Sequence, residues 1–222
     1  MLEPRVVVFG NTSFASLAAY CLAHDSQYRV AAFTVDRAYI GSGSHEGLPV
    51  VAFEELANHY PPGEVRLLIP LGYHAINGLR RDRYLAAKAL GYEFISYVSS
   101  RASTWPDLQV GENCLIYEHA ILQPYARIGN NVIIRSGAHI SHHCEVGDHA
   151  FVAAGVTLGG NVRVGAQVFV GLGAVLRDGL TIAPRTFIGA GSVVVANTEA
   201  DGVYVGNPAR KLGKTAGEVT GG

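Results

Sequence analysis

The sequence contains few charged residues, and neither sign dominates. Charged side chains make up 16% of the 222 residues, and the formal net charge is -1. Nucleic-acid-binding domains usually carry a basic stripe, so this composition predicts no nucleic-acid partner. No apolar run approaches the ~20 residues that cross a bilayer, and the opening residues lack the basic stretch and long apolar segment of a secretion signal. We therefore expect no membrane span.

Cysteine, methionine and tryptophan are also scarce. The chain has three cysteines, Cys21, Cys114 and Cys144, without a CxxC spacing, and one residue each of methionine and tryptophan. Disulfide frameworks of secreted proteins use an even number of cysteines, so this odd set favours a reducing, cytoplasmic location. Glycine, by contrast, occurs 27 times, which indicates many turns.

The first hundred residues alternate between strand-like and helix-like segments. Apolar runs typical of buried strands cover residues 5–9, 28–36, 65–71 and 92–98. Apolar residues at helical spacing occupy residues 13–24, 53–60 and 76–91. Short connections between alternating elements indicate a parallel sheet with right-handed crossovers. The sequence thus predicts an α/β, Rossmann-like domain over residues 1–103.

Beyond residue 104 the pattern changes to a period of six. Every sixth residue from Val110 to Val194 is aliphatic, fifteen in succession, and a small side chain often follows four residues later. A period of six is the hexapeptide repeat of a parallel β-helix, in which three hexads form one triangular coil. We predict a prism of about five coils over residues 104–212, followed by a flexible tail over residues 213–222.

The register of this repeat assigns glycines and cysteines to particular places. Glycine often follows the aliphatic residue directly, as at 111, 129, 147, 159, 165, 171 and 189. We expect these glycines at corners of the prism, where the backbone adopts positive φ. Cys114 and Cys144 fall on small inward positions, so they are predicted to fill the core rather than to bind a ligand.

The segment HISHHCEVG, residues 139–147, is interpretable in the same register. Ile140 and Cys144 point inward, so His142 and His143 lie between them on the outward part of the coil, near a corner. Gly160 follows His142 by eighteen residues and is therefore its vertical neighbour. An exposed imidazole beside a glycine-lined backbone can serve as a general base with an N–H donor close by.

These features together resemble one bacterial family, the sialic-acid O-acetyltransferases and the nucleotide-linked 4-amino-sugar N-acetyltransferases. The resemblance covers nearly the whole chain and is carried by the two-domain order, the hexads and the segments SHHCEVGD, LGGNVRVG and GVYVGNPARKL. It implies a homotrimer of left-handed β-helices with acetyl-CoA in the grooves between neighbouring prisms. It also implies acetylation of the amino group of a nucleotide-linked amino sugar by direct attack, with a histidine as general base.

The resemblance assigns roles to individual residues. The family's catalytic histidine lies in a His-(Glu/Asp)-Cys motif, which His142 and Cys144 match. His143 replaces the family's orienting carboxylate, which leaves that role to Asn161 or to a carboxylate of another subunit. Phe151 stands where relatives often carry a histidine that helps to hold the cofactor. The Gly160 N–H matches the group that faces the thioester carbonyl, and the residues implied to bind CoA are Gly160, Gly173, Gly191, Arg210 and Lys211.

The resemblance further implies that the first domain holds the nucleotide of the sugar. Relatives have a glycine-rich first turn, whereas this turn reads GNTSFA, with a single glycine. A strand–turn–helix still presents N–H groups and hydroxyls to an anion, and ligands bind beyond the carboxyl ends of parallel strands. The predicted substrate-binding residues are Gly10, Thr12, Ser13, Asp36, Gly72 and Tyr73.

Other functions were weighed against the same residues. Hexad-repeat carbonic anhydrases bind zinc through a His-x-x-x-x-His pair, but Cys144 follows His139 and Asp148 follows His143 at that spacing, so no metal site is predicted. Sugar nucleotidyltransferases need a larger first domain, and a non-enzymatic scaffold would show a filled groove or a missing base. O-acetylation of a sugar hydroxyl stays open beside N-acetylation, because both use the same base and groove.

Overall fold

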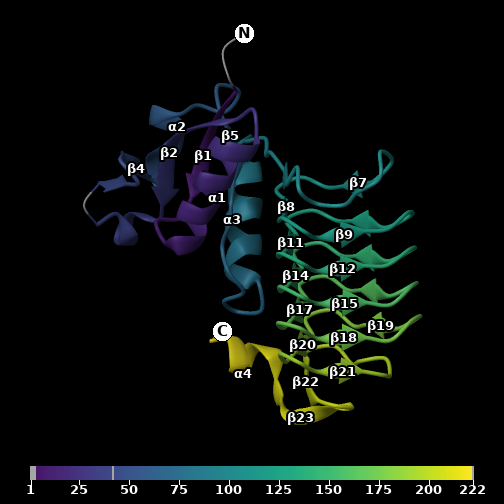
Figure 1. Ribbon diagram of the computed structural model, residues 1–222. Helices are drawn as coiled ribbons and strands as arrows, with labels where there is room; N and C mark the ends of the chain where they lie inside the picture. The colour runs from purple at the N-terminus through teal and green to yellow at the C-terminus, as the bar shows by residue number, and fades with distance from the viewer. Residues whose placement is uncertain (1–3, 42, 222) are drawn as a thin grey trace.

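The computed structural model describes residues 4–41 and 43–221, and it consists of an α/β unit packed against a triangular prism (Figure 1). Within the described residues, the α/β unit contains a five-stranded sheet of order β3-β4-β2-β1-β5. Neighbouring strands are parallel except for the β3–β4 hairpin, which the sequence analysis did not foresee. The strands are β1 (Arg5–Phe9), β2 (Arg29–Val35), β3 (Ser44–His45), β4 (Leu48–Ala52) and β5 (Arg66–Leu68).

Helices cover both faces of this sheet because β1 is apolar on both sides. Val8 of β1 belongs to the same buried cluster as Leu22, whereas Val7 belongs to the cluster that contains Ala87. This arrangement confirms the predicted Rossmann-like fold. No helix within the described ranges is both long and apolar enough to cross a membrane. The helices of this unit are α1 (Ser13–Asp25), α2 (Leu56–His59) and α3 (Gly78–Ala89), with 3-10 turns η1 (Arg37–Tyr39) and η2 (Phe53–Glu55).

The segment 92–98, predicted to be one strand of the first sheet, connects the two units instead. Phe94 forms an isolated bridge with Leu67 in the middle of β5. The strand β6 (Tyr97–Val98) pairs with β8 of the prism, not with β5. The prism sheet therefore begins a few residues before the predicted boundary at residue 104, because the chain crosses between the units within one apolar run.

The prism is a left-handed β-helix, as predicted. Between residues 109 and 194, all of which the structure describes, fifteen two-residue strands recur every six residues. Each strand pairs in parallel with the strand eighteen residues away, for example β12 with β9 and β15. The strands are β7 (Gln109–Val110), β8 (Leu115–Ile116), β9 (Ile121–Leu122), β10 (Arg127–Ile128), β11 (Ile133–Ile134), β12 (His139–Ile140), β13 (Glu145–Val146), β14 (Phe151–Val152), β15 (Thr157–Leu158), β16 (Arg163–Val164), β17 (Phe169–Val170), β18 (Val175–Leu176), β19 (Thr181–Ile182), β20 (Phe187–Ile188) and β21 (Val193–Val194).

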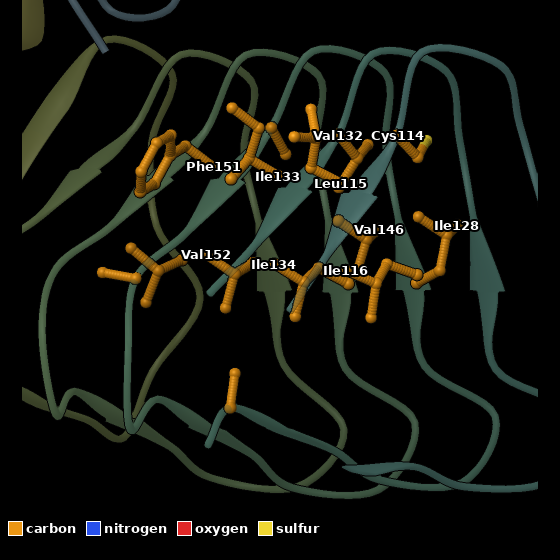
Figure 2. Packing of buried hydrophobic residues seen from close by; sticks show 14 of the residues in the cluster. Cys114, Leu115, Ile116, Ile128, Val132, Ile133, Ile134, Val146, Phe151 and Val152 are labelled. Atoms are coloured by element: carbon orange, nitrogen blue, oxygen red, sulfur yellow. The ribbon is translucent and has the colours of Figure 1, made fainter. Parts of the chain in front are cut away.

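The second residue of each strand builds the interior of the prism. Figure 2 shows Ile116, Ile134 and Val152 stacked in one row inside successive coils. The small residues at the intervening inward positions, such as Cys114 and Cys144, have no exposed surface. Burial in such stacks is the main favourable contribution to the stability of the prism, at roughly 25 cal/mol per Å² of apolar surface.

The first residue of each strand points outward, and the three faces differ in chemistry. The β14 face carries Leu115, Ile133, Phe151, Phe169 and Phe187. The first four are buried, and Phe187 is partly buried. The β13 face carries the exposed polar side chains Gln109, Arg127, Glu145, Arg163 and Thr181. The β12 face carries the less polar set Ile121, His139, Thr157, Val175 and Val193. Only the first of these faces is covered within one chain.

The glycines of the repeat have a different role from the one predicted. From Val110 to Ile188, positive φ occurs three residues after each inward aliphatic residue, for example at His143 (57°) and Asn161 (59°). The glycines that follow the aliphatic residue directly do not adopt positive φ, but they lie against the next coil. A Cβ on Gly147 would come within 2.9 Å of the Val164 carbonyl oxygen. The repeat therefore requires glycine there for close approach of backbones.

The α/β unit rests on the β14 face through aromatic side chains and one arginine. The Phe14 and Tyr73 rings lie 6.4 Å and 5.9 Å from the Phe151 ring. Arg80 of α3 is fully buried and donates hydrogen bonds to prism carbonyl oxygens. Its acceptors in the prism are Asn131, His149 and Ala150.

The C-terminal residues close the prism and return to the α/β unit. The strand β22 (Gly202–Gly206) pairs with β20, and β23 (Ala209–Thr215) folds back on β22. Residues 213–221 form the end of β23 and the helix α4 (Ala216–Thr220), not the flexible tail that was predicted (Figure 1). The helix is ordered because Thr215 and Glu218 form a capping box and Thr220 is buried.

Candidate functional site

His142 and His143 lie in the turn between β12 and β13, and both side chains are exposed. Their Nδ1 atoms are 3.2 Å apart, and the two rings stand nearly perpendicular, at 83°. The Tyr125 ring, one coil away, lies 4.6 Å from the His143 ring. His143 thus contacts both Tyr125 and His142, and its Nδ1 faces Nδ1 of the His142 imidazole.

The backbone of His142 is fixed by hydrogen bonds to the coils on either side. Its N–H donates to Gln123 Oε1 at 3.0 Å, and its carbonyl oxygen accepts from the Asn161 N–H, also at 3.0 Å. Asn161 was one candidate to orient the imidazole, but the bond it makes here is to the His142 backbone. The contact to the imidazole ring comes from His143.

Gly160 lies directly beside the His142 ring. A Cβ on Gly160 would sit 2.5 Å from Cε1 and 2.7 Å from Nε2 of His142. Real Cβ atoms do not approach other atoms so closely, so any side chain at residue 160 would displace the imidazole. Glycine is required here because the ring occupies the space that a Cβ would fill.

The Gly160 N–H is not free, contrary to the sequence-based expectation. It donates a hydrogen bond of 2.8 Å to Asp178 Oδ1, so in this conformation it does not face a ligand as an oxyanion donor. Asp178 follows Gly160 by eighteen residues and is its vertical neighbour. The repeat register could have pointed to this carboxylate, which the sequence analysis missed.

Cys144, next to the histidines, belongs to the core. It has no exposed surface, and its Sγ lies 3.0 Å from the Gly159 carbonyl oxygen. Burial raises the pKa of the Cys144 thiol, which makes it a poor nucleophile at neutral pH. In the part of the chain that the structure describes, no three His, Cys, Asp or Glu side chains form a group that could hold a metal ion.

The other residues expected to contact CoA lie away from His142 within one chain. Gly173 and Gly191 have φ of 64° and 65° in turns between the β14 face and the β12 face. They therefore border the opposite edge of the β12 face from His142. Arg210 and Lys211 are exposed on β23, and Lys211 Nζ lies 2.6 Å from Glu199 Oε2.

The residues expected to bind the nucleotide gather beyond the carboxyl ends of β1, β2 and β5. This carboxyl edge comprises residues 10–13, 36 and 72–73. Gly10 adopts φ of 117°, and Thr12 and Ser13 are exposed at the start of α1. Thr12 occupies the N-cap position, but its side chain makes no capping hydrogen bond. The structure thus brings the predicted loops to one edge of the sheet.

Asp36 has a partner that the sequence analysis did not identify. Its Oδ2 lies 2.9 Å from NH2 of Arg83 on α3 and also accepts from Nε of that arginine at 3.1 Å. Asp36 was expected to accept from a ribose or a base, but here its carboxylate is paired with a cation. No local pattern marks Arg83 for this contact, because it arises from the packing of α3 beside β2.

Tyr73 connects the carboxyl edge to the prism. Its ring lies 4.2 Å from the Phe169 ring, and the side chain is 44% exposed. Phe151, at the position where relatives often carry a cofactor-binding histidine, is instead buried beneath the α/β unit. In this chain Phe151 therefore contributes to packing between the units.

The carboxyl edge and the turn that carries His142 and His143 lie on different sides of the prism. The α/β unit covers the β14 face, whereas His142 lies in the corner between the β12 and β13 faces, which points away from that unit (Figure 1). A cavity of about 780 Å³ along α1, whose lining includes Tyr20, His24 and Tyr28, contains no residue of either of them. One chain therefore does not bring the two halves of the candidate site together.

Comparisons with known proteins extend these observations. The family described as "Bacterial transferase hexapeptide (six repeats)" matches residues 107–142 and 125–160. No curated protein matches the sequence significantly.

Solved structures match nearly the whole chain. The acetyltransferase domain of PglB from Neisseria gonorrhoeae is 26% identical, with 94% of this chain and 99% of that chain covered and a TM-score of 0.85. PerB from Caulobacter crescentus, solved with CoA and GDP-perosamine, is also 26% identical, with coverages of 96% and 99% and a TM-score of 0.84. A variant of the Caulobacter crescentus GDP-perosamine N-acetyltransferase, with one histidine replaced by alanine, superposes with a TM-score of 0.86 at 26% identity and the same coverages.

Proposed function

We propose that this chain, a hexapeptide-repeat transferase of the sialic-acid O-acetyltransferase and amino-sugar N-acetyltransferase family, acetylates the amino group of a nucleotide-linked amino sugar with acetyl-CoA. The observation that carries the proposal is the His142 imidazole, packed on Gly160 and oriented by His143. The likeness to PglB and PerB over both units supports it. In this proposal residues 1–103 hold the nucleotide sugar and residues 104–212 carry out acyl transfer. Free cysteines support a cytoplasmic location.

The proposed reaction is direct attack of the sugar amine on the thioester carbonyl. His142 accepts the amine proton at Nε2 as the C–N bond forms; the C–S bond then breaks, and the proton leaves with the CoA thiol. For Nε2 to carry a lone pair, the ring proton must sit on Nδ1, which faces Nδ1 of His143. His143 therefore accepts this hydrogen bond and keeps His142 in the tautomer that can act as a base.

The test of the proposal is a screen of nucleotide-linked amino sugars with acetyl-CoA. Thiol release and product mass are followed together. We expect one thiol for each acetyl group added, and a product that resists hydroxylamine, because amides resist it and esters do not. A hydroxylamine-sensitive product would identify the O-acetyltransferase instead. Thiol release without any acetylated sugar would refute both.

Gly160→Ala tests the close contact with the base. We expect it to lower kcat roughly tenfold to a hundredfold, because displacing a catalytic group by about 1 Å has effects of this size. Gly213→Ala is the control, since a Cβ there meets no atom within 4 Å. Equal activity of the two variants would show that the position of the His142 ring does not matter.

We also propose that the active protein is a homotrimer whose sites lie between neighbouring chains. Two features support this: His142 and the carboxyl edge lie on different sides of one prism, and the β12 face leaves apolar side chains exposed. Ile121 and Val175 on that face are 39% and 41% exposed. Gly173 and Gly191 border the far edge of the same face, so packing against a second copy can bring them to His142.

Mixed trimers test the shared site. His142→Ala subunits and subunits with Asp36→Ala and Tyr73→Ala should each be nearly inactive alone. Co-expressed, they should regain a substantial fraction of the activity, because some sites then combine two intact halves. If mixed trimers stay inactive, or if sedimentation at micromolar concentration gives a monomer, the shared site is wrong.

A further inference from the structure

Three consecutive residues after the carboxyl edge adopt left-handed backbone conformations. Ala75, Ile76 and Asn77 have φ of 50°, 46° and 65°. A β-branched residue at positive φ, such as Ile76, is a true outlier and its backbone is strained. Strain of this kind persists only where surrounding contacts enforce it, and it clusters at functional sites.

This left-handed turn, residues 75–77, is hydrogen-bonded to the backbone of Tyr73. The Asn77 N–H donates to the Tyr73 carbonyl oxygen at 3.1 Å, and the Gly78 N–H donates to the Ala75 carbonyl oxygen at 2.8 Å. The turn joins Tyr73 to the start of α3, so the path of the chain through it determines where the half-exposed Tyr73 ring lies. Tyr73 in turn forms part of the carboxyl edge.

The helix α4 at the far end of the chain holds this turn. The Thr220 carbonyl oxygen accepts from the Ala75 N–H at 3.1 Å, and the Thr220 hydroxyl accepts from the Ile76 N–H at 2.8 Å. That hydroxyl donates its own proton to the Ala216 carbonyl oxygen at 2.8 Å. Thr220 is 7% exposed. If these hydrogen bonds were broken, few of the groups could therefore bond to water instead.

The prism holds the other side of the turn. Asn77 Nδ2 donates to the carbonyl oxygens of Gln167 and Val168 at 3.1 and 3.2 Å. Gln167 Nε2 donates to the Ile76 carbonyl oxygen at 3.3 Å. From α3, Arg80 donates to Asn77 Oδ1 at 3.2 Å. The turn is therefore fixed by contacts from three separate segments.

We propose that α4 acts as a clamp on the substrate half of the site, with Thr220 as the positioning residue that keeps the left-handed turn and Tyr73 in place for the nucleotide sugar. This inference rests on the proposed function and deepens it. It assigns a role in substrate binding to a segment that lies far from the carboxyl edge in sequence. Thr220 acts through the turn and does not itself touch the reacting atoms.

The test compares Thr220→Val with Thr220→Ser. Valine keeps the shape of threonine but removes the hydroxyl acceptor, whereas serine keeps the hydroxyl. We expect Thr220→Val to raise the KM for the nucleotide-linked amino sugar roughly tenfold, to leave the KM for acetyl-CoA unchanged, and to speed hydrogen exchange over residues 73–78. Thr220→Ser should restore both values. Removal of residues 216–222 should have the same effect as Thr220→Val or a larger one.

Thr186→Val is the matched structural control. Thr186 is also buried, and its hydroxyl donates to the Ala183 carbonyl oxygen within the prism, not to a residue of the left-handed turn. It should lower thermal stability without changing the KM for the nucleotide sugar. If the Thr186 and Thr220 variants raise that KM equally, the effect comes from a general loss of stability of the fold, and the clamp is refuted.

Direct binding separates this inference from the proposed function. Calorimetry with UDP and GDP measures the nucleotide half of the site without any acetyl transfer. Weaker nucleotide binding by Thr220→Val, with rescue by serine, supports the clamp even if the sugar screen fails and the proposed function is wrong. Unchanged nucleotide affinity in Thr220→Val, or no binding by the unaltered protein, overturns the clamp.

Discussion

Replacing His142 by alanine is expected to lower kcat by roughly 10²–10⁴-fold, the usual contribution of a general base. The amine proton then has no acceptor at the position that Nε2 occupies beside Gly160. Binding of acetyl-CoA should persist, because the residues proposed to bind CoA do not depend on the imidazole. Steady-state kinetics with both substrates, together with calorimetry for acetyl-CoA, checks the two expectations.

Substitutions of other histidines in the repeat make this prediction specific. His143→Ala should be milder, because His143 orients the base through its Nδ1 contact and does not accept the amine proton. His119→Ala is the control. His119 is exposed, and its place in another turn of the prism is equivalent to that of His143, with the same left-handed backbone. If His143→Ala proved more damaging than His142→Ala, the base would be His143, and the assignment would be wrong by one residue.

Arg80→Met should lower the free energy of unfolding by about 3–5 kcal/mol, because several buried carbonyl oxygens are left without a donor and each such group costs about 1–3 kcal/mol. Methionine keeps much of the apolar stem, so the loss reports on the guanidinium. Without it the carbonyl oxygens of Asn131 and His149 lose the hydrogen bonds that Arg80 donates. Burial lowers the pKa of Arg80 to about 9, which leaves it charged at neutral pH.

Urea denaturation at one fixed protein concentration measures this loss, because the stability of an oligomer depends on concentration. Arg81→Met is the control on the same helix. The Arg81 side chain is 36% exposed, pairs with Asp82 and donates to Gln167 Oε1 at 2.9 Å. Water can replace these exposed contacts, so its removal should change stability by less than about 1 kcal/mol. If the free energy of unfolding of Arg80→Met is within about 1 kcal/mol of that of the unaltered protein, the buried arginine does not hold the two units together.

The prism could be predicted almost in full from the sequence. A period of six fixes which side chains point inward, and the same local geometry recurs in every coil, so Ile140, Cys144 and the exposed His142 were placed correctly. The vertical neighbours followed as well, since residues eighteen apart pair in register. The role of the glycines was not predicted. A glycine needed for close approach to the next coil looks the same in the sequence as a glycine needed for positive φ.

The carboxyl edge could be predicted in outline but not in detail. Alternating apolar runs indicated the parallel sheet and therefore where the loops after β1, β2 and β5 would meet. The pairing of Asp36 with Arg83 depends on how α3 lies against the sheet, and no spacing in the sequence encodes it. The segment 92–98 is mostly apolar along its whole length, so its composition could not distinguish one sheet from the other.

The sequence by itself determined the two-unit architecture, the coil register and the outward position of His142, because these follow from local periodicity that each residue shares with its neighbours in the chain. Only the tertiary structure decided that Arg80 enters the prism and that Thr220 reaches the turn after Tyr73. These contacts join residues 69 and 144 positions apart. They form between segments that are distant in sequence and meet only after the chain has folded. Because each contact occurs once, it produces no repeating pattern in the sequence.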